Sequence, residues 1–381
     1  MLNRYFSQNC EGHLVKRRQA LSLLGVALAS GVSVSALGQY VIPEGQVRLV
    51  FNENPYGPSP KAIAAVNEIL SLSAYYPDSP TDFPILDDLI NAISQKHDVG
   101  RENLLVSSGS NEALQAAVLT YGKLGKVLVP ALTYDAHLSY AKALGVGVVS
   151  VPLRDDLQVD LDAMKSQVDD TISLVYLANP NNPTGIPIDA AALREFCREV
   201  GKKAVIIIDE AYNELTDNPA DQSMVDLVRD HQNVLITRTF SKIFGMAGMR
   251  VGYGIGHPEI IARVNSALMA WPNGIGLTAA YHSYQDEEFI AFSRQKILEG
   301  RAMVNATLHS AGVIPVPSQT NFVFADIGVD AAEFVAQMAR RNVQIRGGYT
   351  DYPHYIRVSM GKLEDLKVFD RVFRDLFRGK A

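Results

Sequence analysis

The stretch that decides the fold reads Thr239-Phe-Ser-Lys-Ile-Phe-Gly-Met-Ala-Gly-Met-Arg-Val-Gly-Tyr253. An apolar run, 233–237, leads into it and predicts a buried strand, and a second short apolar run, 251–255, follows it. Lys242 and Arg250 lie between them with hydroxyl side chains and glycines. A lysine at the end of a buried strand is partly desolvated, which lowers its pKa and favours attack on a carbonyl. The hydroxyls and the arginine together suit a phosphate group.

A reactive lysine beside a phosphate site fits a phosphorylated cofactor that carries a carbonyl group, and pyridoxal phosphate is the obvious candidate. The alternative is a strand, a turn and a surface lysine that bind no ligand. Residues elsewhere in the chain bear on this choice.

The chain has 381 residues with ordinary apolar content and moderate charge, which predicts two folded domains or one large α/β unit. The net charge of −6 includes no basic stripe beyond the first twenty residues, so nucleic-acid binding has no electrostatic support. Cys10 lies in a segment that we expect to be removed, which leaves Cys197 alone. The sequence therefore predicts neither an internal disulfide nor a metal site.

The first forty residues differ from the rest. Lys16-Arg17-Arg18 precede a weakly apolar segment, 20–37, which ends in small residues suited to a signal peptidase. Residues 1–38 resemble a twin-arginine export signal, with Lys16 where that motif usually has Ser or Thr. The resemblance implies the twin-arginine machinery as a partner and a periplasmic or otherwise exported protein. A membrane anchor and a cytosolic amphipathic extension are the alternatives.

Other apolar, β-branched runs alternate with helical segments and predict a parallel sheet covered on both faces. We expect strands at 103–107, 125–129, 146–151, 173–178 and 204–209, and helices at 60–70, 83–96, 112–121, 190–201, 258–270 and 277–311. Ligands of such sheets bind at the carboxyl ends of the strands. The side chains expected at that edge are Tyr134, Asn182, Asp209, Tyr212, Ser241 and Lys242.

The remaining chain, 313–378, alternates short strands and helices and predicts a smaller α+β domain, with strands at 320–324, 343–346 and 355–359. We expect an amino-terminal segment, 39–80, to complete this small domain. The large domain is expected at 81–290 and the small carboxyl-terminal domain at 291–381.

Several strand-end residues suit one cofactor. Asp209 ends a wholly apolar strand, where a carboxylate is costly unless a cation or a donor meets it, and a protonated pyridine nitrogen would do so. Asn182 and Tyr212 would donate to an oxygen on the same ring, and Tyr134 would stack on its face. Each residue also has an ordinary structural explanation: a helix cap, loop chemistry, a half-buried core tyrosine and side-chain packing.

Two further positions suit anions. The segment 108–112, Ser-Gly-Ser-Asn-Glu, connects a strand to a helix, and the free N–H groups of a first helical turn can bind a phosphate. Many such turns bind nothing. Arg357 lies in an apolar strand and needs an anionic partner, which would be a substrate carboxylate, a substrate phosphate or an internal acid.

Taken in order and spacing, these segments resemble the fold type I pyridoxal-phosphate aminotransferases, and among them the histidinol-phosphate aminotransferase family. The resemblance covers about residues 48–376. It rests on Asn-Glu-Asn-Pro-Tyr-Gly-Pro-Ser-Pro (52–60), Ser-Gly-Ser-Asn-Glu (108–112), Asn-Pro-Asn-Asn-Pro-Thr-Gly (179–185), Asp-Glu-Ala-Tyr (209–212), Thr-Phe-Ser-Lys (239–242), Arg-Val-Gly-Tyr (250–253) and Arg-Val-Ser-Met-Gly (357–361).

The resemblance implies catalytic roles for Lys242, Asp209 and Tyr212. It implies that the cofactor is held by Ser110, Asn111, Tyr134, Asn182, Asp209, Tyr212, Thr239, Ser241, Lys242 and Arg250. Tyr76 would reach the cofactor phosphate of a neighbouring subunit, which implies a homodimer with shared active sites. Arg357 would bind the substrate anion, with Tyr56 and Arg346 as neighbours.

Two segments depart from the family pattern. The order Ala270-Trp271-Pro272-Asn273 stands where family members often carry Pro-aromatic-Asn, and the loop 346–355 is rich in tyrosine. Both segments, Trp271 included, are expected to line the substrate pocket. We therefore expect an amino donor other than histidinol phosphate, such as an aromatic amino acid or a specialised metabolite, and a 2-oxo acid acceptor such as 2-oxoglutarate.

Two other functions stay open on these grounds. The same cofactor also supports elimination, cyclisation, racemisation and decarboxylation, and the lysine motif does not separate these reactions from transamination. The second is a non-catalytic binding protein that keeps the fold.

Overall fold

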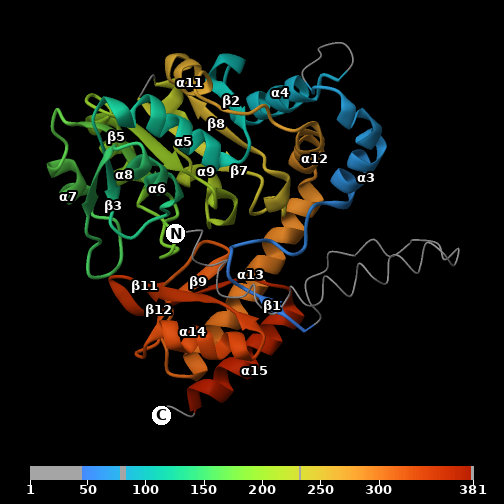
Figure 1. Ribbon diagram of the computed structural model, residues 1–381, viewed down its shortest axis with the longest axis vertical. Helices are drawn as coiled ribbons and strands as arrows, with labels where there is room; N and C mark the ends of the chain where they lie inside the picture. The colour runs from blue at the N-terminus through green and yellow to red at the C-terminus, as the bar shows by residue number, and fades with distance from the viewer. Residues whose placement is uncertain (1–44, 78–82, 231–232, 379–381) are drawn as a thin grey trace, which may run out of the picture. The chain divides into compact units, whose positions relative to one another are not determined.

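The structure is a computed structural model that describes residues 45–77, 83–230 and 233–378. The expected export signal, 1–38, lies outside the described residues. Within them, seven strands form one sheet in the order β2-β8-β7-β6-β5-β3-β4 (Figure 1). These strands are β2 (Leu104–Ser107), β3 (Lys126–Pro130), β4 (Gly147–Val151), β5 (Ile172–Ala178), β6 (Val205–Asp209), β7 (Val234–Thr239) and β8 (Gly252–Gly256).

The sheet is mostly parallel. Strands β7, β6, β5, β3 and β4 run parallel to one another, and β8 is antiparallel to both β7 and β2. All residues of β6 and β7 are buried, as parallel strands are when both faces of the sheet are covered. The predicted α/β class with a mostly parallel seven-stranded sheet is confirmed.

Helices cover the two faces of this sheet. Ile207 packs in one apolar cluster with Leu114 and Leu138, whereas Ile208 packs in another with Leu193, because successive strand residues point to opposite faces. The helices of this large domain are α4 (Ile85–His97), α5 (Ser110–Thr120), α6 (Ala136–Ala143), α7 (Leu161–Ser166), α8 (Ala190–Val200), α9 (Pro219–Gln222), α10 (Asp226–Arg229), α11 (Pro258–Asn265) and α12 (Gly274–Tyr284).

A smaller α+β domain contains an antiparallel sheet in the order β11-β12-β9 and a parallel pair, β1 with β10. Figure 1 shows α13 leading from the large domain into this one. Its strands are β1 (Val47–Arg48), β9 (Phe322–Asp326), β10 (Val343–Gln344), β11 (Arg346–Tyr349) and β12 (Tyr352–Ser359), and its helices are α13 (Glu287–Ser310), α14 (Ala331–Arg340) and α15 (Leu363–Arg378).

One expectation needs correction. The single helix expected at 277–311 is two helices, because α12 ends at Tyr284 and Asp286 caps α13 by accepting from the Phe289 N–H. In the expected amino-terminal segment, β1 pairs with β10 of the small domain and α3 (Pro60–Ile69) packs on α12.

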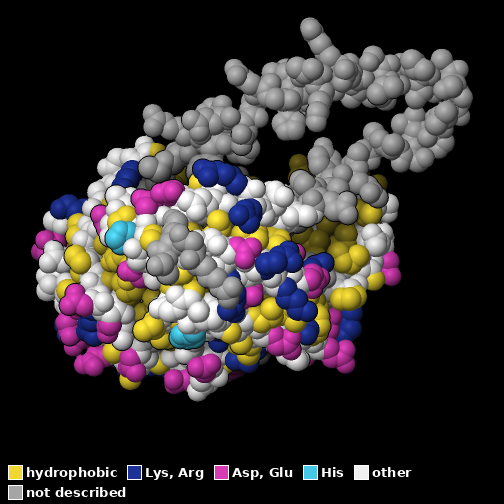
Figure 2. Space-filling model, turned by 90° about the horizontal axis from the view of Figure 1, so that it is seen from below, with side chains coloured by type: hydrophobic (Ala, Val, Ile, Leu, Met, Phe, Trp, Pro, Cys, Tyr) yellow, Lys and Arg dark blue, Asp and Glu magenta, His cyan; other side chains and the backbone are white. Residues whose placement is uncertain are grey.

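Across residues 45–77, 83–230 and 233–378, every helix is too short or too polar to cross a membrane. On the face shown in Figure 2, Lys and Arg side chains lie among Asp and Glu side chains.

Candidate active site

Polar side chains from three neighbouring strands follow the carboxyl edge of the sheet. Asn182 comes after β5, Asp209 ends β6 and Lys242 follows β7. Because β5, β6 and β7 are adjacent and parallel, their carboxyl ends lie side by side. The expected collection of these residues at one edge follows directly from the sheet order.

Lys242 is half-buried, and burial together with the positive charge of Arg357 lowers the pKa of its amine to about 8, although the charge of Asp209 acts in the opposite direction. Lys242 Nζ donates to the backbone oxygen of Asn52 at 3.1 Å and lies 5.7 Å from the centre of the Tyr212 ring. A large share of this amine is therefore neutral near pH 8, as a nucleophile or a base must be.

Asp209 is buried, with 6% of its surface exposed, and burial raises the pKa of its carboxyl group to about 6. Its two oxygens accept from Tyr176 Oη at 3.1 Å and from Thr237 Oγ1 at 3.2 Å. These neutral donors leave the negative charge without a full counter-charge, so a protonated ring nitrogen is a fitting partner.

The expected phosphate cradle has two halves in close contact. Ser110 and Asn111 open α5, while Ser241 accepts from Arg250 Nη1 at 3.4 Å and from Thr239 Oγ1 at 3.0 Å. A Cβ atom at Gly109 would collide with the Arg250 guanidinium. Backbone donors, hydroxyls and one guanidinium are thus held together at a helix N-terminus, which suits a phosphate.

Tyr134 lies over this region. Its hydroxyl donates to Asn111 Oδ1 at 3.1 Å, and its ring stacks on His137 with 6.3 Å between ring centres. Burial raises the pKa of Tyr134 to about 12, and the charges of Asp209, Arg250 and Arg346 also act on it. The tyrosine is neutral and offers an aromatic face between the two ends of the site.

Arg357 is buried in β12, with 5% of its surface exposed, and burial lowers its pKa. Its Nη1 donates to Asn182 Oδ1 at 2.7 Å and its Nη2 to the Val50 oxygen at 2.8 Å. Its Nε has no acceptor, and no described carboxylate forms an ion pair with it. The sequence left open an internal acid as partner, and the described residues provide none.

Four of the expected site residues make their described contacts elsewhere in the chain or lie exposed. Tyr56 turns away, since its hydroxyl accepts from the Leu363 N–H at 3.0 Å. Tyr76 and Trp271 are 77% and 62% exposed and contact each other, with 5.4 Å between ring centres. Arg346 is exposed, although it is the register partner of Arg357 across β11 and β12.

Sequence reasoning missed Asn52 and Tyr176. Asn52 touches Lys242, Tyr212 and Ser359 from a left-handed backbone conformation, φ 56°. The available signal was its place at the start of the segment 52–60, together with the tolerance of asparagine for positive φ. Tyr176 lies inside β5, and only the fold shows that its hydroxyl reaches Asp209.

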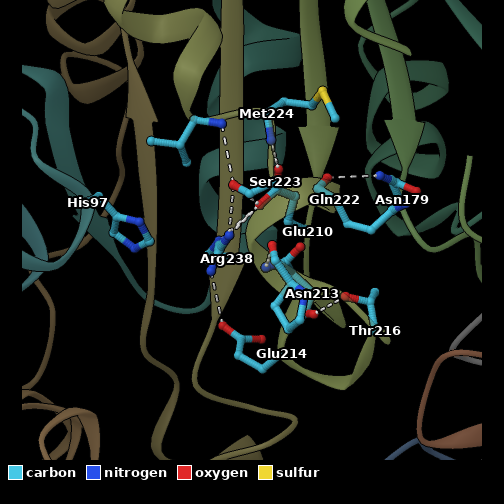
Figure 3. A network of polar contacts seen from close by, with 12 residues as sticks. His97, Asn179, Glu210, Asn213, Glu214, Thr216, Gln222, Ser223, Met224 and Arg238 are labelled. Carbon is cyan, nitrogen blue, oxygen red and sulfur yellow. Dashed lines mark hydrogen bonds and ion pairs between the residues drawn. The ribbon is translucent and has the colours of Figure 1, made fainter. Parts of the chain in front are cut away.

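A buried ion cluster joins Arg238 of β7 to Glu210, the residue that follows β6 (Figure 3). Glu210 accepts from Arg238 at 2.6 Å and 3.0 Å and from the Met224 N–H at 2.7 Å, while Arg238 also reaches Glu214 at 3.3 Å. Ser223 donates to Glu210 at 3.1 Å. The cluster links the end of β6 to the end of β7, the two strands that carry Asp209 and lead to Lys242.

The chain belongs to the family of class I and II aminotransferases, whose model matches residues 44–371. It is therefore a pyridoxal-phosphate-dependent aminotransferase. The buried Asp209 without a full counter-charge, the desolvated amine of Lys242 and the cradle around Arg250 fit that cofactor.

Individual relatives and solved structures agree. The histidinol-phosphate aminotransferase of Moorella thermoacetica is 34% identical over 334 residues, which cover 87% of this chain and 85% of the relative. That of an Anaeromyxobacter species is 36% identical over 319 residues, covering 82% and 86%. The histidinol-phosphate aminotransferase of Sinorhizobium meliloti, solved in complex with pyridoxal 5'-phosphate, is 25% identical with a TM-score of 0.79, covering 92% of this chain and 100% of that one.

Proposed function

We propose that this aminotransferase takes an α-amino acid with an aromatic or large apolar side chain as donor and a 2-oxo acid as acceptor. The observation that carries the proposal is Arg357, a buried cation without a described carboxylate partner, hydrogen-bonded to Asn182 beside the Lys242 amine. A guanidinium so placed binds a carboxylate in two-point fashion. The substrate carboxylate fixes the α carbon near the amine.

The chain's own residues then have distinct tasks. Lys242 Nζ takes the proton from the substrate α carbon, because its lowered pKa leaves it neutral in part near pH 8. Asp209 would hold a proton on the ring nitrogen of the cofactor, and Tyr212 and the free amide hydrogens of Asn182 would donate to the ring oxygen. Pyridoxal phosphate, when bound, supplies a ring that accepts the electrons released at the α carbon.

The phosphate end and the ring face involve other residues. Backbone N–H groups of Ser110 and Asn111 would bind the phosphate together with the Thr239 and Ser241 hydroxyls and the Arg250 guanidinium. Tyr134 would pack on the ring. These contacts would fix the position of the cofactor relative to the Lys242 amine.

The preference for an aromatic side chain rests on the β11–β12 hairpin. Tyr355 stacks on Phe324 with 4.7 Å between ring centres, and Tyr349 meets the same phenylalanine edge-on at 5.4 Å. The buried Tyr349 hydroxyl has no acceptor among the described residues, and the Arg357 charge acts on it. Phe324 is fully buried and supports the two half-buried tyrosines from inside. A half-buried tyrosine ring beside the carboxylate-binding arginine suits a large ring-bearing donor.

An amino-donor screen on the purified holoenzyme tests this proposal. Each α-amino acid, and histidinol phosphate, is supplied with 2-oxoglutarate, and both the new oxo acid and the glutamate co-product are measured. Aromatic donors should give the highest kcat/KM. Efficient turnover of histidinol phosphate, the substrate named for several relatives at 30–36% identity, with little turnover of aromatic amino acids would contradict the proposal.

We further propose a homodimer in which Tyr76 reaches the cofactor phosphate of the partner. Aminotransferases are typically dimers, and Tyr75, Tyr76, Met269 and Trp271 expose 70%, 77%, 82% and 62% of their surfaces. Light scattering gives the mass in solution. Mixing the inactive variants Tyr76→Ala and Lys242→Ala should restore activity if the site is shared, whereas no recovery from mixed dimers would oppose it.

We also propose that residues 1–38 direct export by the twin-arginine route. The paired Arg17 and Arg18, the weakly apolar segment and the small residues after it support this, and the family match begins later, at residue 44. Sequencing the mature amino terminus after cell fractionation tests it, with Arg17→Lys/Arg18→Lys as the matched variant. An intact amino terminus in the cytosolic fraction would oppose it.

A further inference from the structure

Asn52 makes more polar contacts than a residue in a simple turn needs. It is 2% exposed and adopts φ 56°. Its N–H donates to Ser359 Oγ at 2.9 Å, and that hydroxyl donates back to Asn52 Oδ1 at 2.7 Å. Its backbone oxygen accepts from Lys242 Nζ at 3.1 Å and from Asn321 Nδ2 at 2.9 Å.

The remaining contact points toward the cofactor. Asn52 Nδ2 donates to Tyr212 Oη at 3.0 Å. Because that oxygen accepts the amide hydrogen, its own hydrogen is left to donate elsewhere, and in the loaded enzyme the ring oxygen of the cofactor would be its acceptor. A phenol oxygen that accepts a hydrogen bond is the stronger donor through its own O–H.

We propose that Asn52 is a positioning residue that acts through Tyr212 to set the pH at which Lys242 Nζ, in its covalent linkage to the cofactor, loses its proton. A donor to the ring oxygen stabilises negative charge there. An oxygen stabilised in this way attracts the neighbouring proton on Nζ less, so the nitrogen deprotonates at lower pH. Removing the Asn52 amide weakens Tyr212 as a donor and should raise that pH.

Other charged groups also act on Lys242 Nζ, and they are unchanged when the Asn52 side chain is removed. Arg357 and Arg250 lower the pKa of Lys242, while Asp209 and Glu53 raise it. The same Arg357 and Asp209 charges, together with Tyr134, act on Tyr212. None of them contacts the Asn52 side chain. Its other side-chain contact is with the Ser359 hydroxyl, so a comparison in a background without the Tyr212 hydroxyl isolates the contact with Tyr212.

The experiment is a pH titration of the visible absorbance of the cofactor in the holoenzyme without any amino donor. Asn52→Gly keeps the positive φ at no steric cost and leaves the backbone oxygen for Lys242. Its titration midpoint should rise by about 0.5 pH unit, the size expected for one neutral hydrogen bond. The result is independent of which amino acid the enzyme uses.

A double-mutant cycle separates this role from a structural one. In a Tyr212→Phe background, Asn52→Gly should leave the midpoint unchanged, because the residue through which it acts is gone. Asn54→Ala removes a buried amide that contacts Ile243 and Ser293 instead, and should leave the midpoint unchanged in the wild-type background.

Two outcomes would overturn the proposal: an unchanged midpoint in Asn52→Gly, or an equal rise in the presence and absence of the Tyr212 hydroxyl. Should Asn52→Gly fail to fold, Ser359→Ala takes its place. It frees the Asn52 side chain without touching Tyr212 and should shift the midpoint in the same direction, whereas an unchanged midpoint there also overturns the proposal.

Discussion

Replacing Arg357 with methionine should remove most of the enzyme's ability to use amino acids. Of the five N–H groups of its guanidinium, Asn182 and Val50 accept one each, which leaves three for a substrate. A carboxylate bound at two points would take two of them. Hydrogen bonds to charged groups contribute about 1.5–3 kcal/mol each, so the loss is about 3–6 kcal/mol. That corresponds to a fall of roughly 10²- to 10⁴-fold in kcat/KM.

The assay is steady-state transamination with a panel of α-amino acids, with cofactor occupancy checked by absorbance. Since all donors present the same α-carboxylate, the fall in Arg357→Met should be similar for each. Arg357→Lys keeps the charge without the two-point geometry and should fall less. Arg346→Met is the matched comparison from the facing strand, and it should affect only donors that carry a second anionic group.

Less than a tenfold fall for every donor in a fully loaded Arg357→Met enzyme would refute this role. A fall in kcat/KM confined to donors with a second anionic group would show that Arg357 binds that group. Another cation would then bind the α-carboxylate. An enzyme that loses its cofactor on the substitution is recognised by the absorbance check and is compared only after reloading.

Three further predictions concern stability, the cofactor and pH. Glu210→Gln should lower the free energy of unfolding by about 3 kcal/mol, as measured with denaturant, because it leaves the buried Arg238 without its main partner. An equal loss of stability in Glu214→Gln, at the more exposed carboxylate, would contradict this. Gly109→Ala should weaken cofactor binding at least tenfold, as measured by cofactor release, because its Cβ meets Arg250; Gly145→Ala has the same positive φ in open space and should not. Reloading of the apoenzyme needs neutral Lys242, so its rate should rise with pH and level off above about 8; a rise continuing to about 10.4, the value of an exposed lysine, would contradict the lowered pKa.

The sheet and its functional edge were predictable because their signals are local. The expected strand 204–209 is β6 (Val205–Asp209), and a wholly apolar run bounded by polar residues leaves little choice of structure. Once the strands are parallel and adjacent, the residues that follow them must share one edge. Asp209 and Lys242 could therefore be placed together from their positions in the sequence.

The break between α12 and α13 was missed although its signal is also local. Asp286 is an N-cap residue, and Glu287 and Glu288 follow it in the first turn of α13, a pattern typical of a helix start. Asn52 was missed for a different reason, since it contacts Tyr212 and Ser359, 160 and 307 residues further along the chain. Those partners are brought near only by the fold.

The alternation of strand residues explains why the site and the ion cluster of Figure 3 occur together. Thr237 bonds to Asp209, and Thr239 bonds to Ser241 in the phosphate cradle, so Arg238 between them must point to the opposite face. There it meets Glu210, the residue after Asp209. The Arg238–Glu210 ion pair thus fixes the spacing of the two strand ends on one face of the sheet. Thr237 and Thr239, on either side of Arg238, contact the site on the other face. The strand ends that carry Asp209 and lead to Lys242 are therefore held in place, and the charges of Arg238 and Glu210 stay outside the site.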